Sequence, residues 1–238
     1  MPLWGAREWA IVALSGVLHV LYYVVLLRGY RKADLTVVYP LARGTGPLVT
    51  ALVAVTLLGE RLSLTAVLGI AGVVAGVFLI AGGPGLLRAG RDEQARRLVR
   101  KGMQYGVLTG LFIASYTVVD GYAVKVMLLS PILVDYMGNF VRVLVLAPVA
   151  LRKPAELAPL WAAQWRFALL VAAVSPVAYV LVLFAMQSAP LSHVAPAREV
   201  SMLFAALLGG HLLGEGDRAA RLAGALLIAC GVVALALG

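Results

Sequence analysis

Three arginines lie inside stretches of sequence that are otherwise apolar enough to cross a lipid bilayer: Arg43, Arg142 and Arg198. Counted from Leu35, Arg43 lies about 12 Å along a helix, which places its guanidinium within the hydrocarbon layer. A charged side chain is costly there, so it should face protein or a water-filled cavity rather than lipid. Because guanidinium groups bind carboxylate, phosphate and phosphonate oxygens in pairs, these arginines predict recognition of a small oxyanion.

Further polar side chains occur in the same apolar runs, many of them at helical spacing from one another. Asp120 or Glu199 would balance the positive charge of the arginines or carry a coupling proton. The tyrosines would supply aromatic packing. Together with the arginines, the predicted substrate-binding residues are Arg43, Arg198, Tyr39, Asp120, Tyr116, Asn139, Arg142, Glu199, Tyr23, His19 and Tyr179.

Two other interpretations of these residues stay open. In the first, the charged groups only form salt bridges between helices, and Asp135 lies near the end of its run at the membrane interface. In the second, a membrane-embedded enzyme uses Asp120, Asp135 and His19, which must then converge within hydrogen-bond reach. The sequence has no HExxH, Walker or GxSxG motif, and its three histidines are far apart, so we predict no catalytic residue, no metal and no cofactor.

The composition sets the class of protein that must position these groups. With 62% hydrophobic and only 13% charged residues, the chain cannot cover the surface of a soluble domain of 238 residues. We therefore predict an all-α polytopic membrane protein embedded in a lipid bilayer. The formal charge of +9 lies mostly in short links between apolar runs, which favours anionic lipid headgroups over nucleic acid as the partner. A single cysteine, Cys230, excludes an internal disulfide.

The apolar runs predict about eight membrane spans of roughly 20 residues each. Two longer polar segments separate some of them. In residues 84–101 we expect a basic linker whose end, residues 96–101, forms a short helix along the headgroups. In residues 152–166 we expect an interfacial belt containing Trp161 and Trp165. The predicted spans are residues 9–28, 35–58, 63–83, 103–125, 129–151, 166–187, 190–213 and 219–237.

An internal repeat relates the two ends of the chain. At an offset of 155 residues, Arg43 aligns with Arg198, Gly69 with Gly224 and Gly76 with Gly231, within 14 identities over the 42 positions 42–83. The offset pairs spans one to three with spans six to eight, so the unit has five helices. An odd number of crossings inverts the second copy relative to the first. The predicted organisation is a three-helix first repeat (1–83) that lacks its first two helices, the linker (84–101) and a five-helix second repeat (102–238).

The distribution of basic residues predicts an orientation in the membrane. Links on one side contain 14 of the lysines and arginines outside the spans, whereas links on the other side contain three. Since positive charge accumulates on the cytoplasmic side, both termini are predicted to lie outside.

These motifs together resemble those of the EamA-type drug/metabolite transporters. The similarity rests on Arg31-Lys32-Ala33-Asp34-Leu35, on Tyr39-Pro40-Leu41-Ala42-Arg43-Gly44 with Pro47, and on Leu58-Gly59-Glu60-Arg61-Leu62-Ser63, with Ala195-Pro196-Ala197-Arg198-Glu199 and Leu213-Gly214-Glu215 in the second copy. The resemblance implies a multi-pass inner-membrane carrier of small metabolites, often an exporter, with a cavity between two five-helix repeats. This chain departs from it by the two missing helices and by the predicted orientation of its termini.

The sequence therefore predicts a secondary transporter that moves a small anionic or zwitterionic solute by alternating access, and the family resemblance implies that it is an exporter. The main alternative is a truncated, non-transporting fragment or an assembly partner. Faces of glycines at four-residue spacing permit a homodimer without requiring one.

Overall fold

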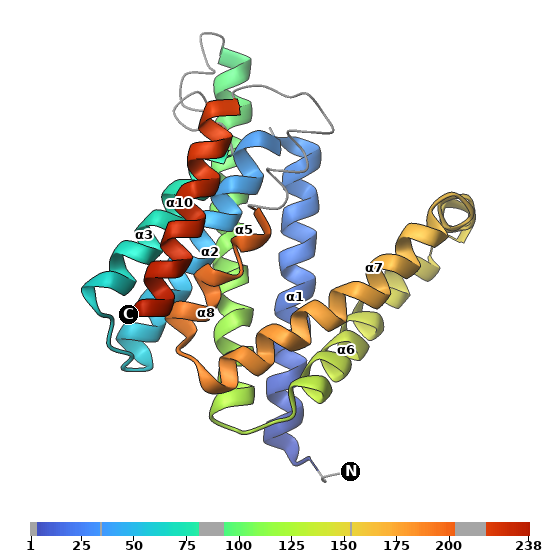
Figure 1. Ribbon diagram of the computed structural model, residues 1–238. Coiled ribbons are helices and arrows are strands. Elements are labelled where there is room, and N and C mark those ends of the chain that lie inside the picture. The colour runs from blue at the N-terminus through green and yellow to red at the C-terminus, as the bar shows by residue number, and fades with distance from the viewer. Residues whose placement is uncertain (1–3, 34, 81–92, 153, 203–217) are drawn as a thin grey trace. The chain divides into compact units, whose positions relative to one another are not determined.

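The computed structural model describes residues 4–33, 35–80, 93–152, 154–202 and 218–238 (Figure 1). In these ranges the chain is helical and contains no strand, which confirms the all-α fold. The helices, in chain order, are α1 (Ala6–Lys32), α2 (Leu35–Leu57), α3 (Leu64–Ile80), α5 (Glu93–Lys125), α6 (Pro131–Leu151), α7 (Pro154–Ser188), α8 (Leu191–Ala197) and α10 (Arg218–Leu237).

Five helices are long and apolar enough to cross a membrane: α1, α6, α7, residues 37–57 of α2 and residues 96–125 of α5. Helix α3 and residues 222–237 of α10 are shorter apolar helices. Seven of the eight predicted spans therefore coincide with observed apolar helices, and the protein is polytopic. The end of the remaining span, residues 203–213, and the Gly214-Glu215 motif lie outside the described residues.

Two predicted boundaries are wrong. Residues 96–101 do not form a separate helix, because α5 runs without a break from Glu93, where Arg97 pairs with Glu93 at 2.6 Å. Residues 154–166 do not interrupt the chain either, because they form the first turns of α7. Pro154 stands at the start of that helix, where its missing N–H costs nothing. Pro159 removes one backbone hydrogen bond without ending the helix.

The chain folds into two compact units. Unit 1 comprises Met1–Leu21 and Val119–Ala189, and unit 2 comprises Tyr22–Val118 and Pro190–Gly238. Helices α1 and α5 each contribute one part to either unit. These limits differ from the repeat limits derived from the sequence, and the division into repeats stays a prediction.

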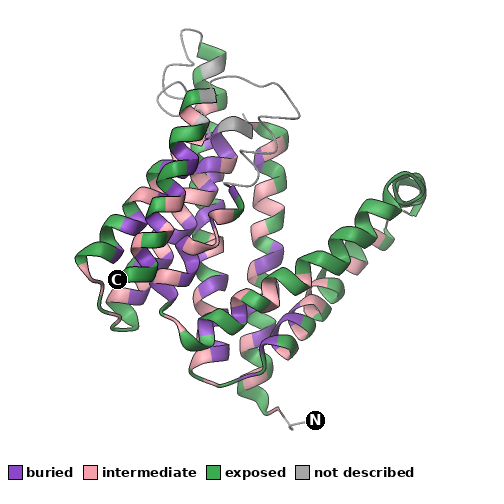
Figure 2. Ribbon diagram, viewed as in Figure 1, coloured by how far each residue is buried: buried purple, intermediate pink, exposed green. Residues whose placement is uncertain are grey.

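In unit 1, helices α6 and α7 pack against each other. Gly16 of α1 faces α6, since a Cβ at this position would lie 2.6 Å from Val141 Cγ1. Helix α7 is exposed along most of its length and buries only Leu183 and Met186 near its end (Figure 2). Its exposed side chains are largely apolar, which suits contact with lipid.

In unit 2, helices α3 and α10 lie side by side and antiparallel (Figure 1). Gly69 faces Gly231, and Gly76 faces Gly224: a Cβ on Gly69 would lie 2.7 Å from the Gly231 carbonyl, and one on Gly76 would lie 2.5 Å from the Gly224 carbonyl. At the repeat offset of 155 residues, Gly69 corresponds to Gly224 and Gly76 to Gly231. The contact between Gly69 and Gly231 therefore corresponds to the contact between Gly224 and Gly76. At these two points the backbones of α3 and α10 approach closely.

The core of unit 2 forms where α2, α3, α10 and the residues following α8 meet. Buried positions on these helices are purple in Figure 2, and the apolar residues among them form one core cluster. They are Ala51, Ala66, Ile70, Val73, Val77, Met202, Ile228 and Leu235. This core fixes α2, which contains Arg43, and the segment after α8, which contains Arg198 and Glu199.

Candidate substrate cavity

The predicted seventh span is not one continuous helix, which corrects the sequence-based expectation. Helix α8 ends at Ala197, a turn follows at Arg198 and Glu199, and helix resumes at residues 200–202. Pro196 has no N–H to donate, and the N–H groups of Glu199 and Met202 bond three residues back, to Pro196 at 3.0 Å and to Glu199 at 2.8 Å. Breaks of this kind at membrane depth are tolerated where the chain faces protein or a cavity, as in the discontinuous helices of transporters.

The carboxylate of Glu60, which follows α2, binds the first turn of α8. Gly59 ends α2 with a φ of +69°, a conformation that favours glycine, and the Glu60 N–H donates to the Ala54 carbonyl at 3.1 Å. This turn directs the Glu60 carboxylate to the N–H groups of Leu191 and Ser192, at 2.8 and 3.0 Å. A carboxylate there satisfies backbone donors at the first turn of α8, which lies far along the chain from Glu60.

Arg43 of α2 reaches the broken segment. Its Nη1 donates to Glu199 Oε1 at 3.3 Å, its Nη2 to Ser201 Oγ at 3.4 Å and its Nε to the Tyr39 hydroxyl at 3.4 Å. The guanidinium carbon also lies 5.6 Å from the centre of the Tyr39 ring. The Arg43 side chain is 29% exposed whereas that of Glu199 is 5% exposed. The carboxylate of this ion pair is thus buried, whereas the arginine side chain is partly exposed.

These residues line a cavity of about 130 Å³ that lies wholly within unit 2. The lining combines two arginines, one carboxylate, three tyrosines, two threonines and a few apolar side chains. It consists of Tyr22, Tyr39, Arg43, Pro47, Thr50, Ile113, Tyr116, Thr117, Ala195, Arg198 and Glu199. Arg43 and Arg198, which the repeat relates to each other, therefore share one cavity.

The second arginine is held from α5. Arg198 Nη1 donates to Thr117 Oγ1 at 3.4 Å. One residue earlier on α5, Tyr116 is buried and meets the ring of Tyr22 edge-on, with 5.7 Å between ring centres. Helices α1, α2 and α5 and the turn after α8 thus each contribute polar side chains to the cavity.

Some residues at the cavity were not predicted from the sequence, and one tyrosine was predicted in place of its neighbour. Tyr22 lines the cavity, whereas its predicted neighbour Tyr23 is 43% exposed and stays outside the lining. Thr117 and Ser201 were not predicted. The i, i+3 spacing of His19 and Tyr22 was a usable signal, but the i, i+4 spacing of His19 and Tyr23 fits a helix face equally well.

Three predicted site residues form a separate cluster in unit 1. His19 of α1 and Asp120 of α5 are buried, with His19 Nε2 4.0 Å from Asp120 Oδ2. The Tyr179 hydroxyl of α7 donates a short hydrogen bond to the same oxygen, and its ring meets the His19 ring edge-on at 5.5 Å.

The remaining predicted residues lie on α6, also in unit 1. Asn139 donates to Asp135 Oδ2 at 3.0 Å, and Arg142 Nη2 lies 3.9 Å from Asp135 Oδ1. Asp135 is buried, with 3% of its surface exposed. These three side chains therefore pair along one face of a single helix, with Asp135 contacting Arg142, whereas the salt-bridge interpretation expected pairs between helices.

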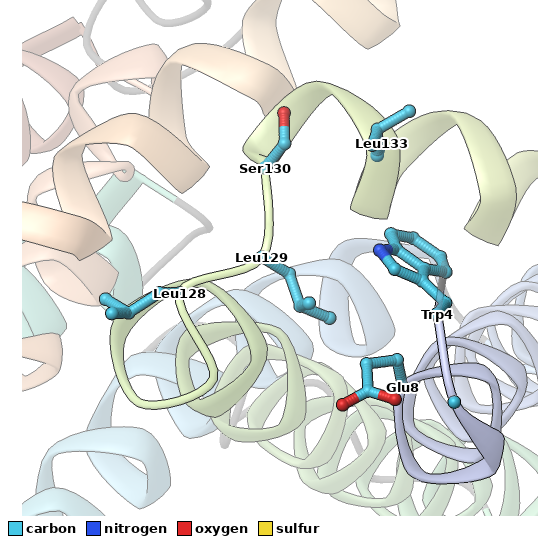
Figure 3. Close-up of a pocket in the computed structure, with 7 residues that line it drawn as sticks. Trp4, Glu8, Leu128, Leu129, Ser130 and Leu133 are labelled. Atoms are coloured by element: carbon cyan, nitrogen blue, oxygen red, sulfur yellow. The ribbon is translucent and has the colours of Figure 1, made fainter. Parts of the chain in front are cut away.

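Unit 1 also contains a larger, shallower hollow of about 580 Å³ beside the start of α1 and α6 (Figure 3). Trp4 and Leu129 point into it, and Glu8 is its one charged lining residue. It has none of the convergent polar groups of the unit 2 cavity, so the smaller cavity is the better candidate site.

The fold and the cavity together define a class: a multi-pass helical membrane protein with a broken helix and buried arginines around a small hollow. The sequence matches the EamA-like transporter family over residues 1–82 and 100–237. The chain belongs to this family and is a membrane transporter of the drug/metabolite type.

Comparison with solved structures agrees on the fold. Thirteen chains match. One of them, described only as "Crystal structure of protein", has a TM-score of 0.68 and 17% sequence identity, over 100% of this chain and 80% of that chain. At this level of identity the likeness concerns the fold alone. No curated protein matches the sequence significantly.

Proposed function

We propose that the protein is a secondary transporter of the inner membrane that exports a small anionic or zwitterionic metabolite by alternating access. Arg43 and Arg198 bind the oxyanion of the solute, and Glu199 balances their charge. The tyrosines that line the cavity pack against its apolar part. A proton gradient or solute exchange supplies the driving force.

The observation that supports this function best is the meeting of Arg43 and Arg198 in one enclosed space. Arg43 comes from a helix with two internal prolines and Arg198 from the turn that follows α8, and discontinuous helices surround the binding sites of inverted-repeat transporters. The internal contacts of Arg43 are long, at 3.3 to 3.4 Å, which leaves room for shorter bonds to a bound anion.

The size and polarity of the cavity limit the solute. Its volume of about 130 Å³ equals roughly four water molecules in the liquid. Glu199 Oε2 is buried and, among the described residues, has no hydrogen-bond partner. That oxygen can accept a bond from an ammonium or hydroxyl group of the solute. A small amino acid or hydroxy acid therefore fits better than an anion without a donor.

Transport into proteoliposomes tests this proposal. The purified chain is reconstituted and loaded in turn with unlabelled glycine, alanine, lactate and methylphosphonate, and entry of the same labelled compound by counterflow is measured. For the compound that enters, Arg43→Ala and Arg198→Ala should each reduce the initial rate to the protein-free background.

Arg97→Ala is the matched control, because Arg97 is exposed and pairs only with its helix neighbour Glu93 in the described structure. This variant should transport at the wild-type rate. Unaltered transport by both cavity variants would reject the recognition role. A correctly inserted wild-type chain that moves none of the four compounds would favour the non-transporting fragment or assembly partner.

A further inference from the structure

Helices α1 and α5 run antiparallel within unit 2 (Figure 1). Tyr22 of α1 meets Tyr116 of α5, with 5.7 Å between ring centres. Further along α1, Gly29 meets Tyr105 of α5, since a Cβ on Gly29 would lie 2.9 Å from Tyr105 Cβ. The last turn of α1 therefore lies beside the beginning of α5.

Basic residues far outnumber acidic ones where these two helix ends meet. The described residues 28–33 and 93–105 contain seven lysines and arginines and one acidic residue, Glu93. Glu93 pairs with Arg97 at 2.6 Å, so this pair has no net charge. The exposed cations nearest to the contact form a basic surface that consists of Arg28, Arg31, Lys32, Arg100 and Lys101. We propose that this basic surface binds the headgroup of an anionic phospholipid.

Helix α2 covers one side of the helix pair at this level. Val38 lies against both helices: a Cβ on Gly29 would lie 3.0 Å from Val38 Cγ1, and one on Gly106 would lie 3.0 Å from the Val38 carbonyl oxygen. Lys32 is three residues from Gly29, and Lys101 is four residues from Tyr105, so each lysine lies on the face of its helix that makes the contact. Because both lysines are exposed, they lie on the side away from α2.

The two lysines also lie at nearly the same depth. Lys32 is about 4.5 Å beyond Gly29 along α1, and Lys101 is about 6 Å beyond Tyr105 along α5, toward the same end of the antiparallel pair. Lysine side chains are long and flexible, so both ammonium groups can reach one phosphate group. A phosphate there offsets the repulsion between the like charges and accepts charge-assisted hydrogen bonds from both helices.

The same helix faces become apolar deeper in the membrane region. Val25 precedes Lys32 by seven residues, and Leu108 follows Lys101 by seven residues, which is two helical turns in each case. Leu108 is exposed and Val25 is partly exposed. Cations at one level and apolar side chains about 10 Å below them match the headgroup and the acyl chains of a phospholipid. A free phosphate would use only the cations.

A lipid bound in this way joins the ends of α1 and α5. By neutralising cations on both helices, it should stabilise the contact between Gly29 and Tyr105 and raise the temperature at which the protein unfolds. The inference does not depend on the proposed function, because none of the five cations lines the cavity of unit 2.

Native mass spectrometry of the full chain in an uncharged detergent tests the site. The protein is mixed with equal amounts of phosphatidylglycerol and phosphatidylcholine that have the same acyl chains. The wild type should retain more phosphatidylglycerol. Lys32→Gln and Lys101→Gln should each lower the ratio of bound phosphatidylglycerol to phosphatidylcholine about fivefold, since each cation near a headgroup contributes roughly that factor. The double variant should lose most of the preference.

Two control variants remove the same amount of charge elsewhere. Arg97→Gln lies one turn from Lys101, but Arg97 is already paired with Glu93. Arg166→Gln removes an exposed cation of α7 that lies over the Trp165 ring. Both controls should keep the wild-type ratio. An equal loss in the controls and in the lysine variants would show that only net charge matters, and would overturn the site.

The wild type alone can also refute the proposal, without any variant having to fold. Equal retention of the two lipids would overturn it. Inorganic phosphate that displaces phosphatidylglycerol as well as the lipid itself does would show that the surface binds free phosphate instead. In thermal unfolding, phosphatidylglycerol should raise the midpoint of the wild type more than phosphatidylcholine does, and the lysine double variant should lose this difference. High salt should weaken the preference, because the cations are exposed.

Discussion

The Glu60 carboxylate accepts hydrogen bonds from both the backbone N–H and the hydroxyl of Ser192, 132 residues further along the chain, at 3.0 and 2.6 Å. Glu60 follows the last turn of α2, the helix that contains Arg43. Ser192 belongs to the first turn of α8, which leads to Arg198. One carboxylate therefore connects the two segments that position the arginines of the cavity.

Replacing Glu60 with Ala should destabilise unit 2 by about 1–2 kcal/mol, because it removes the acceptor for the first N–H groups of α8. Glu60→Gln, which keeps one acceptor oxygen, should lose less. Thermal unfolding of the detergent-solubilised variants measures both effects. Glu93→Ala is the control, because it removes an exposed i, i+4 ion pair and should change stability by less than about 0.5 kcal/mol. Equal losses for Glu60→Ala and Glu93→Ala would contradict the capping role.

Helix α3 should tolerate an added methyl group at Gly72 but not at Gly76. A Cβ at Gly76 would lie 2.5 Å from the Gly224 carbonyl on the antiparallel helix α10, whereas one at Gly72 would lie 3.4 Å from the nearest atom. Gly76→Ala should force the helices apart and cost about 1–3 kcal/mol. Gly72→Ala should be neutral or slightly stabilising because alanine favours helix. Unfolding of the two variants in parallel decides the matter, and similar stabilities would show that the contact is looser than described.

Replacing Glu199 with Gln should change the selectivity of transport more than its maximal rate. Glutamine keeps the size of the side chain and an acceptor oxygen, but it loses the negative charge that the ammonium group of a zwitterion would meet. A charge-assisted hydrogen bond contributes about 1.5–3 kcal/mol, so apparent affinity for alanine should fall roughly tenfold or more relative to lactate. Competition of each compound with a labelled tracer measures this ratio. An unchanged ratio would show that Glu199 serves only to pair with Arg43.

Adjacent tyrosines on α1 offer a matched test of the cavity lining. Tyr22 lines the cavity and contacts Tyr116, whereas Tyr23 is 43% exposed. Tyr22→Ala should reduce transport at least tenfold, because it removes a wall of the cavity and an aromatic contact. Tyr23→Ala should retain most of the transport rate. Transport rates normalised to the amount of inserted protein compare the two variants, and the reverse order would exclude this lining.

The candidate cavity was predictable in its charged residues but not in its assembly. Arg43, Arg198 and Glu199 stood out because a charge within an apolar run is costly unless it is paired or faces a cavity. Tyr22, Thr117 and Ser201 gave no such signal, because hydroxyl and aromatic side chains are ordinary within membrane helices. The predicted set also mixed three groups of residues, since helical spacing shows which side chains share a face but not which faces meet.

Sequence patterns also could not locate the positions at which helices are broken. Hydropathy alone treated residues 190–213 as one span, although Pro196 and the adjacent charges lie at a break after Ala197. Conversely, the polar and proline-rich residues 154–166 looked like an interruption and are helical. Whether a proline ends a helix or is absorbed by it depends on what its neighbours offer the freed carbonyl, and that is a property of the packed protein.

The sequence by itself determined the apolar helices and the presence of charge within them, because these follow from periodicity, composition and the cost of ionised groups in lipid. Only the tertiary structure decided that Arg43 meets Glu199 beside Arg198, that Glu60 holds α8, and that His19 faces Asp120. Each of these contacts joins residues at least 100 positions apart, and the energy that selects them comes from the simultaneous packing of several helices rather than from any local pattern.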